Sequence, residues 1–328
     1  MGPPRQRAAA VSSQPGLTVI RPGLLTTVQD LGRWGSQALG VPVSGAMDTF
    51  AHRLANALVG NVGGMATLEV TLLGPELRAE CALVAAVAGA EFAVTVEGRP
   101  VPHQAAFTVD AGATLRFGER RGGSRAYLAV AGGIATEAVL GSRATHLVSG
   151  MGGHGGRGLR AGDVLPVAVA ARAGAPRAGR PWRWPDPAAG RALRVMLGPQ
   201  DAWFSRQSID ALVREAFRVS TQSNRMGFRL EGPTLAPARA EEPLSEPVPF
   251  GAIQVPAGGA PILLMADRQT AGGYPKIATV IAADLPVAGQ LGPGDVVRFV
   301  ACTRAEARAA LISRERELLR AMPEGVGA

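Results

Sequence analysis

The sequence is almost without lysine, since Lys276 stands alone beside 33 arginines in 328 residues. Cysteine is also scarce: Cys81 and Cys302 lie far apart and outside any CxxC pattern, which argues against a disulfide framework or a zinc site. No apolar run is long enough to span a bilayer, and residues 1–16 contain no apolar signal-peptide core. These absences predict a cytoplasmic protein with no metal site and no membrane contact, and a disordered tail at 1–16.

Two motifs of nucleotide-binding proteins are missing as well. There is no GxxxxGK[ST] phosphate loop, because the single lysine follows Tyr274 and Pro275. A GxGxxG string occurs at 153–158, but a strand-like segment follows it in place of the crossover helix of a dinucleotide fold. The net charge of +8 comes from scattered arginines without interleaved aromatic residues, which is not typical of a nucleic-acid-binding surface. We therefore expect no nucleic acid among the partners.

Glycine and proline are abundant, at 43 and 25 residues, and short apolar segments lie between them. This pattern is typical of many turns and short strands. Strand patterns occur at 17–29 (two strands around a turn), 67–73, 82–88, 91–97, 105–109, 113–118, 126–131, 163–169, 191–199, 216–220, 227–231, 251–255, 260–266, 277–282 and 295–300. The chain is therefore expected to be mainly β.

Three segments show the apolar spacing of an amphipathic helix instead. The first runs from Met47, with Ser44 or Gly45 as the expected N-cap. The second is expected to open at Asp201. The third covers 303–321, where Thr303 and a glutamate three residues later have the spacing of a capping box.

Two pieces of the sequence recur. Residues 70–77 (VTLLGPEL) resemble 228–235 (FRLEGPTL), and 111–117 (AGATLRF) resemble 293–299 (PGDVVRF). The offsets of 158 and 182 residues indicate an internal duplication whose second copy is longer between the two landmarks. The fold class predicted is mainly β with a few helices, built as two β-barrel halves. The expected boundaries are 17–170 for the first half, 171–190 for a linker, 191–302 for the second half, and 303–328 for a C-terminal helix and tail.

Three glycine-rich segments carry polar and charged residues that a core does not need. They contain the phrases TTVQDLGRWG, GVPVSGAMD, SNRMGFRL, PFGAIQVP and ADRQTAGGYPKIATVI. In this order the phrases resemble the family of the 5-oxoprolinase C subunit, allophanate hydrolase subunit 2 and the carboxyltransferase domain of urea carboxylase. The resemblance runs from about residue 17 to 300. Ala271, where a threonine is expected, and Pro247, where a glycine is expected, depart from the family pattern and leave the substrate preference open.

The resemblance implies two cyclophilin-like halves and a role in a larger enzyme. It implies a partner of the allophanate hydrolase subunit 1 type (the 5-oxoprolinase B subunit) and a lactam-hydrolysing A subunit, which together open 5-oxo-L-proline to L-glutamate with ATP. Two alternatives stay open: a carboxyltransferase that acts on urea or a related amide with biotin, and a non-enzymatic regulator that binds a kinase-inhibitor-type partner. We expect no biotin carboxylase or biotin carrier module to be fused to the chain, and this expectation favours the 5-oxoprolinase branch. The chain alone is expected to be inactive.

Lys276 and Tyr274 are the predicted catalytic residues, because both branches create negative charge on oxygen and these side chains donate hydrogen bonds to it. Arg225 and Arg229 are predicted to clamp a carboxylate or phosphate. The remaining predicted substrate-binding residues are Gln29, Asp30, Arg33, Ser44, Asp48, Glu246, Gln254, Gly272 and Gly273. Three simpler interpretations remain. Asp30 with Arg33, or Glu246 with a neighbouring arginine, forms an ion pair that only fixes a loop, Ser44 only caps a helix, and Lys276 is a surface lysine.

Overall fold

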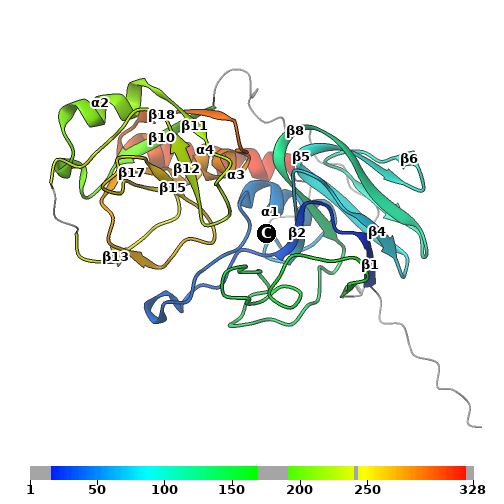
Figure 1. Ribbon diagram of the computed structural model, residues 1–328. Helices are drawn as coiled ribbons and strands as arrows, with labels where there is room; N and C mark the ends of the chain where they lie inside the picture. Colours follow the sequence, from blue (N-terminus) through cyan, green and yellow to red (C-terminus); the bar gives the residue numbers. More distant parts are fainter. Residues whose placement is uncertain (1–15, 169–190, 240–242, 323–328) are drawn as a thin grey trace, which may run out of the picture.

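The chain folds as two β-rich halves that lie side by side (Figure 1). The computed structural model describes residues 16–168, 191–239 and 243–322. The predicted linker 171–190 lies outside these residues, as does nearly all of the predicted tail 1–16. The strand content and the two barrel-like sheets confirm the predicted fold class.

The first half is a nine-stranded sheet that curls around its own core. Its strands are β1 (Gly16–Arg21), β2 (Leu25–Gln29), β3 (Thr67–Thr71), β4 (Glu76–Ala79), β5 (Leu83–Val96), β6 (Arg99–Pro100), β7 (Ala106–Val109), β8 (Thr114–Val130) and β9 (Val164–Pro166). Hydrogen bonds give the order β2-β3-β8-β4-β1-β9, and β5 joins through β8. The prediction of separate strands at 82–88 and 91–97 is wrong, because β5 continues through a bulge. Gly89 (φ 97°) permits it, since a Cβ there would lie 2.5 Å from the Arg125 carbonyl oxygen.

The second half is a closed barrel. Its strands follow the order β10-β17-β14-β15-β12-β11-β18. They are β10 (Arg191–Leu197), β11 (Ala216–Val219), β12 (Gly227–Glu231), β14 (Ala252–Gln254), β15 (Ile262–Leu264), β17 (Lys276–Val280) and β18 (Val296–Ala301). A small ribbon of β13 (Glu246–Pro247) and β16 (Ala271–Gly272) lies outside the barrel sheet. The ribbon belongs to the interval in which the second sequence copy is longer than the first.

The repeated Gly-Pro pair has the same physical cause in both halves. In each half it follows a matching strand, β3 or β12, and the chain turns there. A Cβ at Gly74 would lie 2.2 Å from the Cβ of Phe117, and a Cβ at Gly232 would lie 2.9 Å from Cδ1 of Phe217. Each corner is therefore pressed against a buried phenylalanine, and only glycine leaves room for it.

In the described residues, four α-helices accompany the sheets: α1 (Thr49–Leu58), α2 (Arg206–Arg214), α3 (Leu285–Gly289) and α4 (Arg304–Ala321). Short 3-10 turns occur at η1 (Gln37–Leu39), η3 (Asp201–Trp203) and η4 (Ala282–Asp284). Across the described ranges, no helix has both the length and the apolar character that a membrane span requires.

The helix starts correct two predictions and confirm one. Asp48, not Ser44 or Gly45, caps α1, because its carboxylate accepts a hydrogen bond from the Ala51 N–H at 2.9 Å. Helix α2 begins after the cap Ser205, and the predicted start at Asp201 opens only a 3-10 turn. The capping box of Thr303 on α4 is present as predicted.

Three helices fill the joint between the halves (Figure 1). Helix α4 follows the second barrel, yet its Leu318 and Ala321 are buried in the same apolar cluster as α1 of the first half. Helix α3 presses directly on the start of α1: a Cβ at Gly289 would lie 2.3 Å from the Met47 carbonyl oxygen. The distance between the halves is therefore set by backbone contact at this glycine.

We predict that Gly289→Ala lowers the free energy of unfolding by about 1–3 kcal/mol, because the added methyl group must push α3 away from Met47. Gly258→Ala is the matched control, since an added Cβ there meets nothing within 4 Å. Urea unfolding of both variants measures the difference. Equal stability of the two variants would show that the halves are not in close contact at α3.

Candidate functional site

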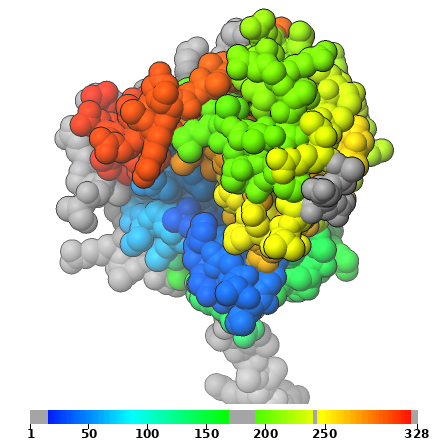
Figure 2. Space-filling model, turned by 90° about the vertical axis from the view of Figure 1, so that its left-hand side faces the viewer, coloured from blue at the N-terminus to red at the C-terminus, as the bar shows by residue number. Residues whose placement is uncertain are grey.

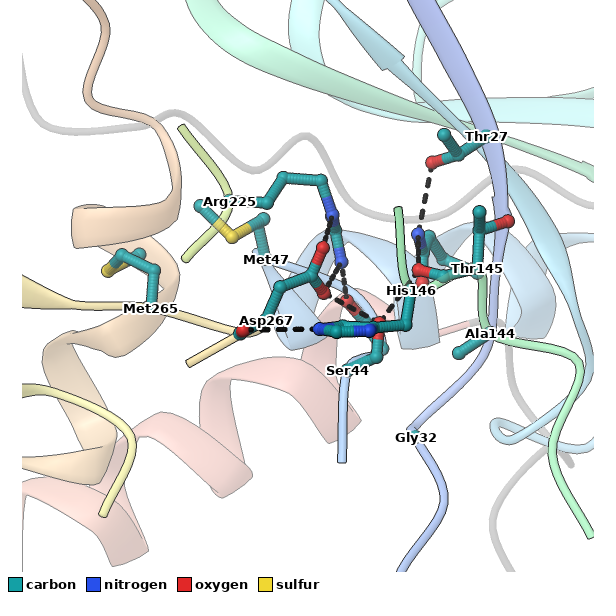
Figure 3. Close-up of polar contacts among 12 residues, drawn as sticks. Thr27, Gly32, Ser44, Met47, Ala144, Thr145, His146, Arg225, Met265 and Asp267 are labelled. Carbon is teal, nitrogen blue, oxygen red and sulfur yellow. Dashed lines mark hydrogen bonds and ion pairs between the residues drawn. The ribbon is translucent and has the colours of Figure 1, made fainter. Parts of the chain in front are cut away.

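A buried cluster of charged side chains joins the two halves. Figure 3 shows the Arg225–Asp267 pair of this cluster. Arg225, in the loop before β12, is 3% exposed. Its Nε and Nη2 donate to the Asp267 carboxylate at 3.0 and 2.9 Å, and its Nη1 donates to Glu69 of the first half. Nη2 also donates to the Gly45 carbonyl oxygen at 2.6 Å. Burial alone lowers the pKa of Arg225, and the two carboxylates raise it above its ordinary value, so the guanidinium stays charged.

The first half holds Glu69 in place for this contact. The Tyr127 hydroxyl donates to Glu69 Oε2 at 2.7 Å, and the Met47 N–H donates to the same oxygen at 2.9 Å. Burial raises the pKa of Tyr127 well above its ordinary value, so the hydroxyl keeps its proton and remains a donor. The same hydroxyl accepts from the Asp48 N–H at 2.8 Å. The start of α1 and the ion pair thus form one buried network.

Asp48 and Gln290 make a second polar link across the joint. Gln290 follows α3, and its Nε2 donates to Asp48 Oδ2 at 2.7 Å. Its Oε1 accepts the backbone N–H groups of Ser124 and Arg125 of β8, at 2.9 and 3.0 Å. Burial raises the pKa of Asp48 to about 7, with the Ala51 N–H and Gln290 acting in the opposite direction. This link therefore contains a carboxyl group that changes charge near neutral pH.

Ser44 connects the first-half loops to Asp267. Its hydroxyl lies 2.6 Å from Asp267 Oδ1 and 2.8 Å from the Thr145 carbonyl oxygen, and its backbone has a φ of 58°. Gln29 Nε2 donates to the same Thr145 carbonyl at 3.1 Å. The interpretation of Ser44 as a helix cap is therefore wrong, because the side chain reaches the other half.

Asp30 and Arg33 fix the neighbouring loops without pairing with each other. Asp30 Oδ1 accepts from the Ser142 hydroxyl at 2.7 Å, and Oδ2 accepts from the Arg143 N–H at 2.6 Å. Arg33 donates to the Ala144 carbonyl oxygen. Burial lowers the pKa of Arg33, while the charges of Asp30 and Asp267 raise it. No Asp30–Arg33 ion pair within 4.0 Å occurs in the described part of the chain, so the interpretation of these two as an ion pair is wrong.

A cavity of about 230 Å³ opens in the second half, next to the charged cluster. It is lined by Gln222, Asn224, Met226, Gly227, Arg229, Gln254, Ile262, Leu264, Arg268, Gln269 and Tyr274. Two loops place successive residues alternately in the cavity and in the charged cluster. In the first loop, Asn224 and Met226 line the cavity, and Arg225 between them bonds Glu69. In the second loop, Arg268 lines the cavity, and Asp267 before it bonds Arg225. The loops are also joined by backbone hydrogen bonds of 2.9 Å, from the Asp267 N–H to the Arg225 carbonyl and from the residue 265 N–H to Met226. The charged cluster thus holds in place the two loops that form walls of the cavity.

The lining combines carboxamides, a phenol and cations. Four carboxamide side chains, the Tyr274 ring, Arg229 and Arg268 surround the space, and no lining residue is a carboxylate. The sequence predictions include Arg229, Gln254 and Tyr274 but miss Arg268, Gln222, Asn224 and Gln269. Arg268 follows Asp267 in the phrase ADRQTAGGYPKIATVI. The sequence therefore draws attention to this segment, but it does not show that the Arg268 side chain lines the cavity.

Lys276 is buried beside the cavity residues and does not line the cavity. It is 3% exposed, so the interpretation of a surface lysine is wrong. Its Nζ lies 3.0 Å from Glu246 Oε2, and Gln200 Nε2 donates to the same oxygen at 2.8 Å. The hydrogen bond from Lys276 holds the pKa of Glu246 below its ordinary value. Glu246 therefore pairs with the lysine, and the interpretation that pairs it with an arginine is wrong.

The glycines of the β13–β16 ribbon bring these groups together. Gly272 pairs with Glu246, and a Cβ on Gly272 would lie 2.3 Å from the Gln269 amide and 3.0 Å from the Gln254 amide. Gln254 is the strand partner of Lys276, and its Nε2 donates to the Tyr274 carbonyl at 3.3 Å. A Cβ on the neighbouring Gly273 would make only ordinary contacts.

The structure therefore divides the predicted site residues into two groups. Ser44, Asp48 and Arg225 make bonds across the joint, and Gln29, Asp30 and Arg33 bond to loops of the first half. Arg229, Glu246, Gln254, Gly272, Tyr274 and Lys276 gather at or beside the cavity, with Gly273 next to them in the ribbon loop. Their roles toward a substrate stay predictions.

Comparison with known proteins gives a consistent result. The family model described as "Carboxyltransferase domain, subdomain A and B" matches residues 39–301. The chain is 39% identical to the 5-oxoprolinase C subunit of Escherichia coli over 301 residues, covering 92% of this chain and 96% of that one. It is 36% identical to the 5-oxoprolinase C subunit of Haemophilus influenzae, covering 89% and 92%. The crystal structure of Kluyveromyces lactis urea carboxylase superposes with a TM-score of 0.88 at 31% identity, and the chain spans 97% of its own length but 30% of that enzyme.

We predict that the free energy of unfolding depends on pH through Asp48 at the joint. Its pKa of about 7 in the folded chain is above the ordinary value of 3.8, so between these pH values the folded state holds a proton that the unfolded state releases. The contribution of Asp48 to the free energy of unfolding therefore falls as pH rises through this window, by about 4 kcal/mol in total. Asp48→Asn removes this contribution, and urea unfolding at several pH values between 4 and 8 measures it.

The quantity to compare between the wild-type chain and Asp48→Asn is the slope of the free energy of unfolding against pH. The absolute free energies are less informative, for two reasons. The new amide faces Gln290 Nε2 and lowers stability at every pH, because two donors then meet. Burial lowers the pKa of His52 to about 4, so His52 contributes a rise in stability between pH 4 and 6.5 in both proteins and cancels. Parallel pH dependence of the wild-type chain and the variant would contradict a raised pKa of Asp48.

Proposed function

The chain belongs to the carboxyltransferase domain A and B family, and from that premise we propose that it is one component of a cytoplasmic, ATP-dependent 5-oxoprolinase that opens 5-oxo-L-proline to L-glutamate. The observation that carries the proposal is the carboxamide-rich cavity beside the Lys276–Glu246 pair. A lactam presents one carbonyl acceptor and one N–H donor, and a carboxamide side chain can satisfy both. The names of the two bacterial relatives support the same assignment.

In the proposed reaction, water is added across the C–N bond of the lactam. The C–N bond breaks, the carbonyl carbon gains the hydroxyl group, and the ring nitrogen gains the proton. A second water molecule is consumed as ATP is converted to ADP and phosphate. Tyr274 is proposed to donate its phenolic hydrogen to the lactam oxygen as negative charge develops there. Lys276 is proposed to supply a fixed positive charge behind that oxygen, and Glu246 holds its ammonium in place at 3.0 Å.

ATP is proposed to bind on the partner proteins of the complex. Mg²⁺-nucleotides need carboxylate or phosphate-loop ligands, and the cavity lining contains neither. We assign that task to an allophanate hydrolase subunit 1-type partner (the 5-oxoprolinase B subunit) and a lactam-hydrolysing A subunit. On this assignment, the present chain positions the amide and the partners supply the energy of phosphoryl transfer.

Carboxyl transfer to urea is the second candidate, and the likeness to Kluyveromyces lactis urea carboxylase favours it. In that reaction biotin supplies the carboxyl group. The carboxamides of Gln254 and its neighbours in the cavity are suited to the carbonyl and N–H groups of a ureide as well as to those of a lactam. Both reactions therefore belong in the same experiment.

We predict that Lys276→Arg lowers the turnover of the assembled complex by about 100-fold or more, the size of effect seen when one charge-stabilising donor is removed. The longer planar guanidinium cannot occupy the buried position in which the amine meets Glu246. The measurement is glutamate release from 5-oxoproline with ATP, after co-expression with both partner proteins.

Arg99→Lys, an exchange between the same two residue types at an exposed position of the first half, is the control and should keep full turnover. Full turnover by Lys276→Arg would refute a role for the amine. Carboxylation of urea in place of glutamate release, when a biotin-bearing partner is supplied, would move the chain to the second candidate function.

A further inference from the structure

Arg268 is held in a fixed orientation at the cavity wall. It is 8% exposed, its Nε donates to the Val248 carbonyl at 2.9 Å, and its Nη1 lies 3.5 Å from the Met265 carbonyl. Its guanidinium carbon lies 5.4 Å from the centre of the Phe250 ring. An arginine has five N–H donors, so these contacts leave three of them for a ligand in the cavity that Arg268 lines.

Arg268 differs from the other buried arginines of the described ranges in lacking a nearby carboxylate. Arg225, Arg125 and Arg191 each lie within 4.0 Å of an acidic side chain, and Arg33 feels the charges of two aspartates. For Arg268, no described carboxylate lies within 4.0 Å. Burial lowers its pKa to about 10, and no acidic neighbour acts in the opposite direction. A buried cation without a counter-ion is a costly arrangement that an anionic ligand would relieve.

The surrounding cavity is suited to a small anion that also contains an amide. Arg229 adds a second cation to the lining, and no lining residue is acidic. The remaining polar lining consists of carboxamides and Tyr274, while Met226, Ile262 and Leu264 offer an apolar surface. A planar guanidinium matches the two oxygens of a carboxylate, with which it forms paired hydrogen bonds.

We propose that Arg268 forms the carboxylate-binding end of this cavity and makes it selective for small amides that carry a carboxylate over neutral ones. Naming 5-oxo-L-proline as the ligand rests on the proposed function. The carboxylate binds Arg268, and the ring amide then faces the carboxamides and Tyr274. Urea and 2-pyrrolidinone have no carboxylate and leave Arg268 without its counter-ion.

The test is an NMR titration of the full chain with 5-oxo-L-proline and with 2-pyrrolidinone, the same ring without the carboxylate. We expect the wild-type chain to bind 5-oxo-L-proline at least about tenfold more tightly. Arg268→Gln should remove that preference by weakening 5-oxo-L-proline alone, and Arg268→Lys should keep part of it. Arg229→Gln, at the exposed cation of the same cavity, should have the smaller effect. Amide spectra of each variant verify that it is folded. If Arg268→Gln does not fold, Arg268→Lys takes its place in the comparison of the two rings.

Equal binding of the two rings by the wild-type chain, or no binding of either, would overturn the carboxylate subsite. So would an unchanged preference in Arg268→Gln. Inorganic phosphate and acetate are titrated in parallel. Tighter binding of phosphate than of acetate would also overturn the assignment of a carboxylate subsite. The proposed function fails separately: if the complex releases no glutamate while the chain still prefers the carboxylate ring, the subsite stands and the reaction must be another one on an anionic amide.

Discussion

The structure depends on one guanidinium placed between two carboxylates. Arg225 of the second half bonds Asp267 of its own barrel and Glu69 of the other half, all of them buried. Removing one partner from such a buried set typically costs about 3–5 kcal/mol, because the remaining charge is left uncompensated. The net stabilisation from the intact set is smaller, so its main consequence is geometric: with Arg225 bonded on both sides, the two halves have one favourable arrangement. The close contact of Gly289 with Met47 allows the separation that this arrangement requires.

The same guanidinium links the joint to the cavity. Loops near 225 and 267 place alternate residues in the charged cluster and in the cavity wall, so neither wall can move without disturbing the ion pair. Figure 2 shows the face where the blue segment of the first half lies against the yellow segment of the second. The cavity is therefore walled by loops that the ion pair holds in place, while the charges of that ion pair stay buried. Preorganised donors of this kind suit chemistry that develops negative charge on oxygen.

Much of the fold could be predicted from the sequence, because its signals are local. The capping box at Thr303, the Gly-Pro corners and the alternating strands each involve residues within a few positions of one another. The site was only partly predictable. In the sequence Glu69 is simply a residue of a strand, although it contacts Arg225, 156 residues away. Arg268 escapes prediction because nothing local distinguishes a buried arginine without a carboxylate from the many that pair, and only the folded surroundings reveal it.

Hydrogen exchange in Glu69→Gln tests most directly whether the joint holds the cavity walls. The amides of Met265 and Asp267 bond to the carbonyls of Met226 and Arg225 and report on both loops at once. Both amides should exchange at least about tenfold faster in this variant, although Glu69 belongs to the other half and lines no part of the cavity. Glu91→Gln, at an exposed position of the same half, should leave both rates unchanged. Exchange of both amides at the wild-type rate in Glu69→Gln would show that the joint does not hold the cavity walls.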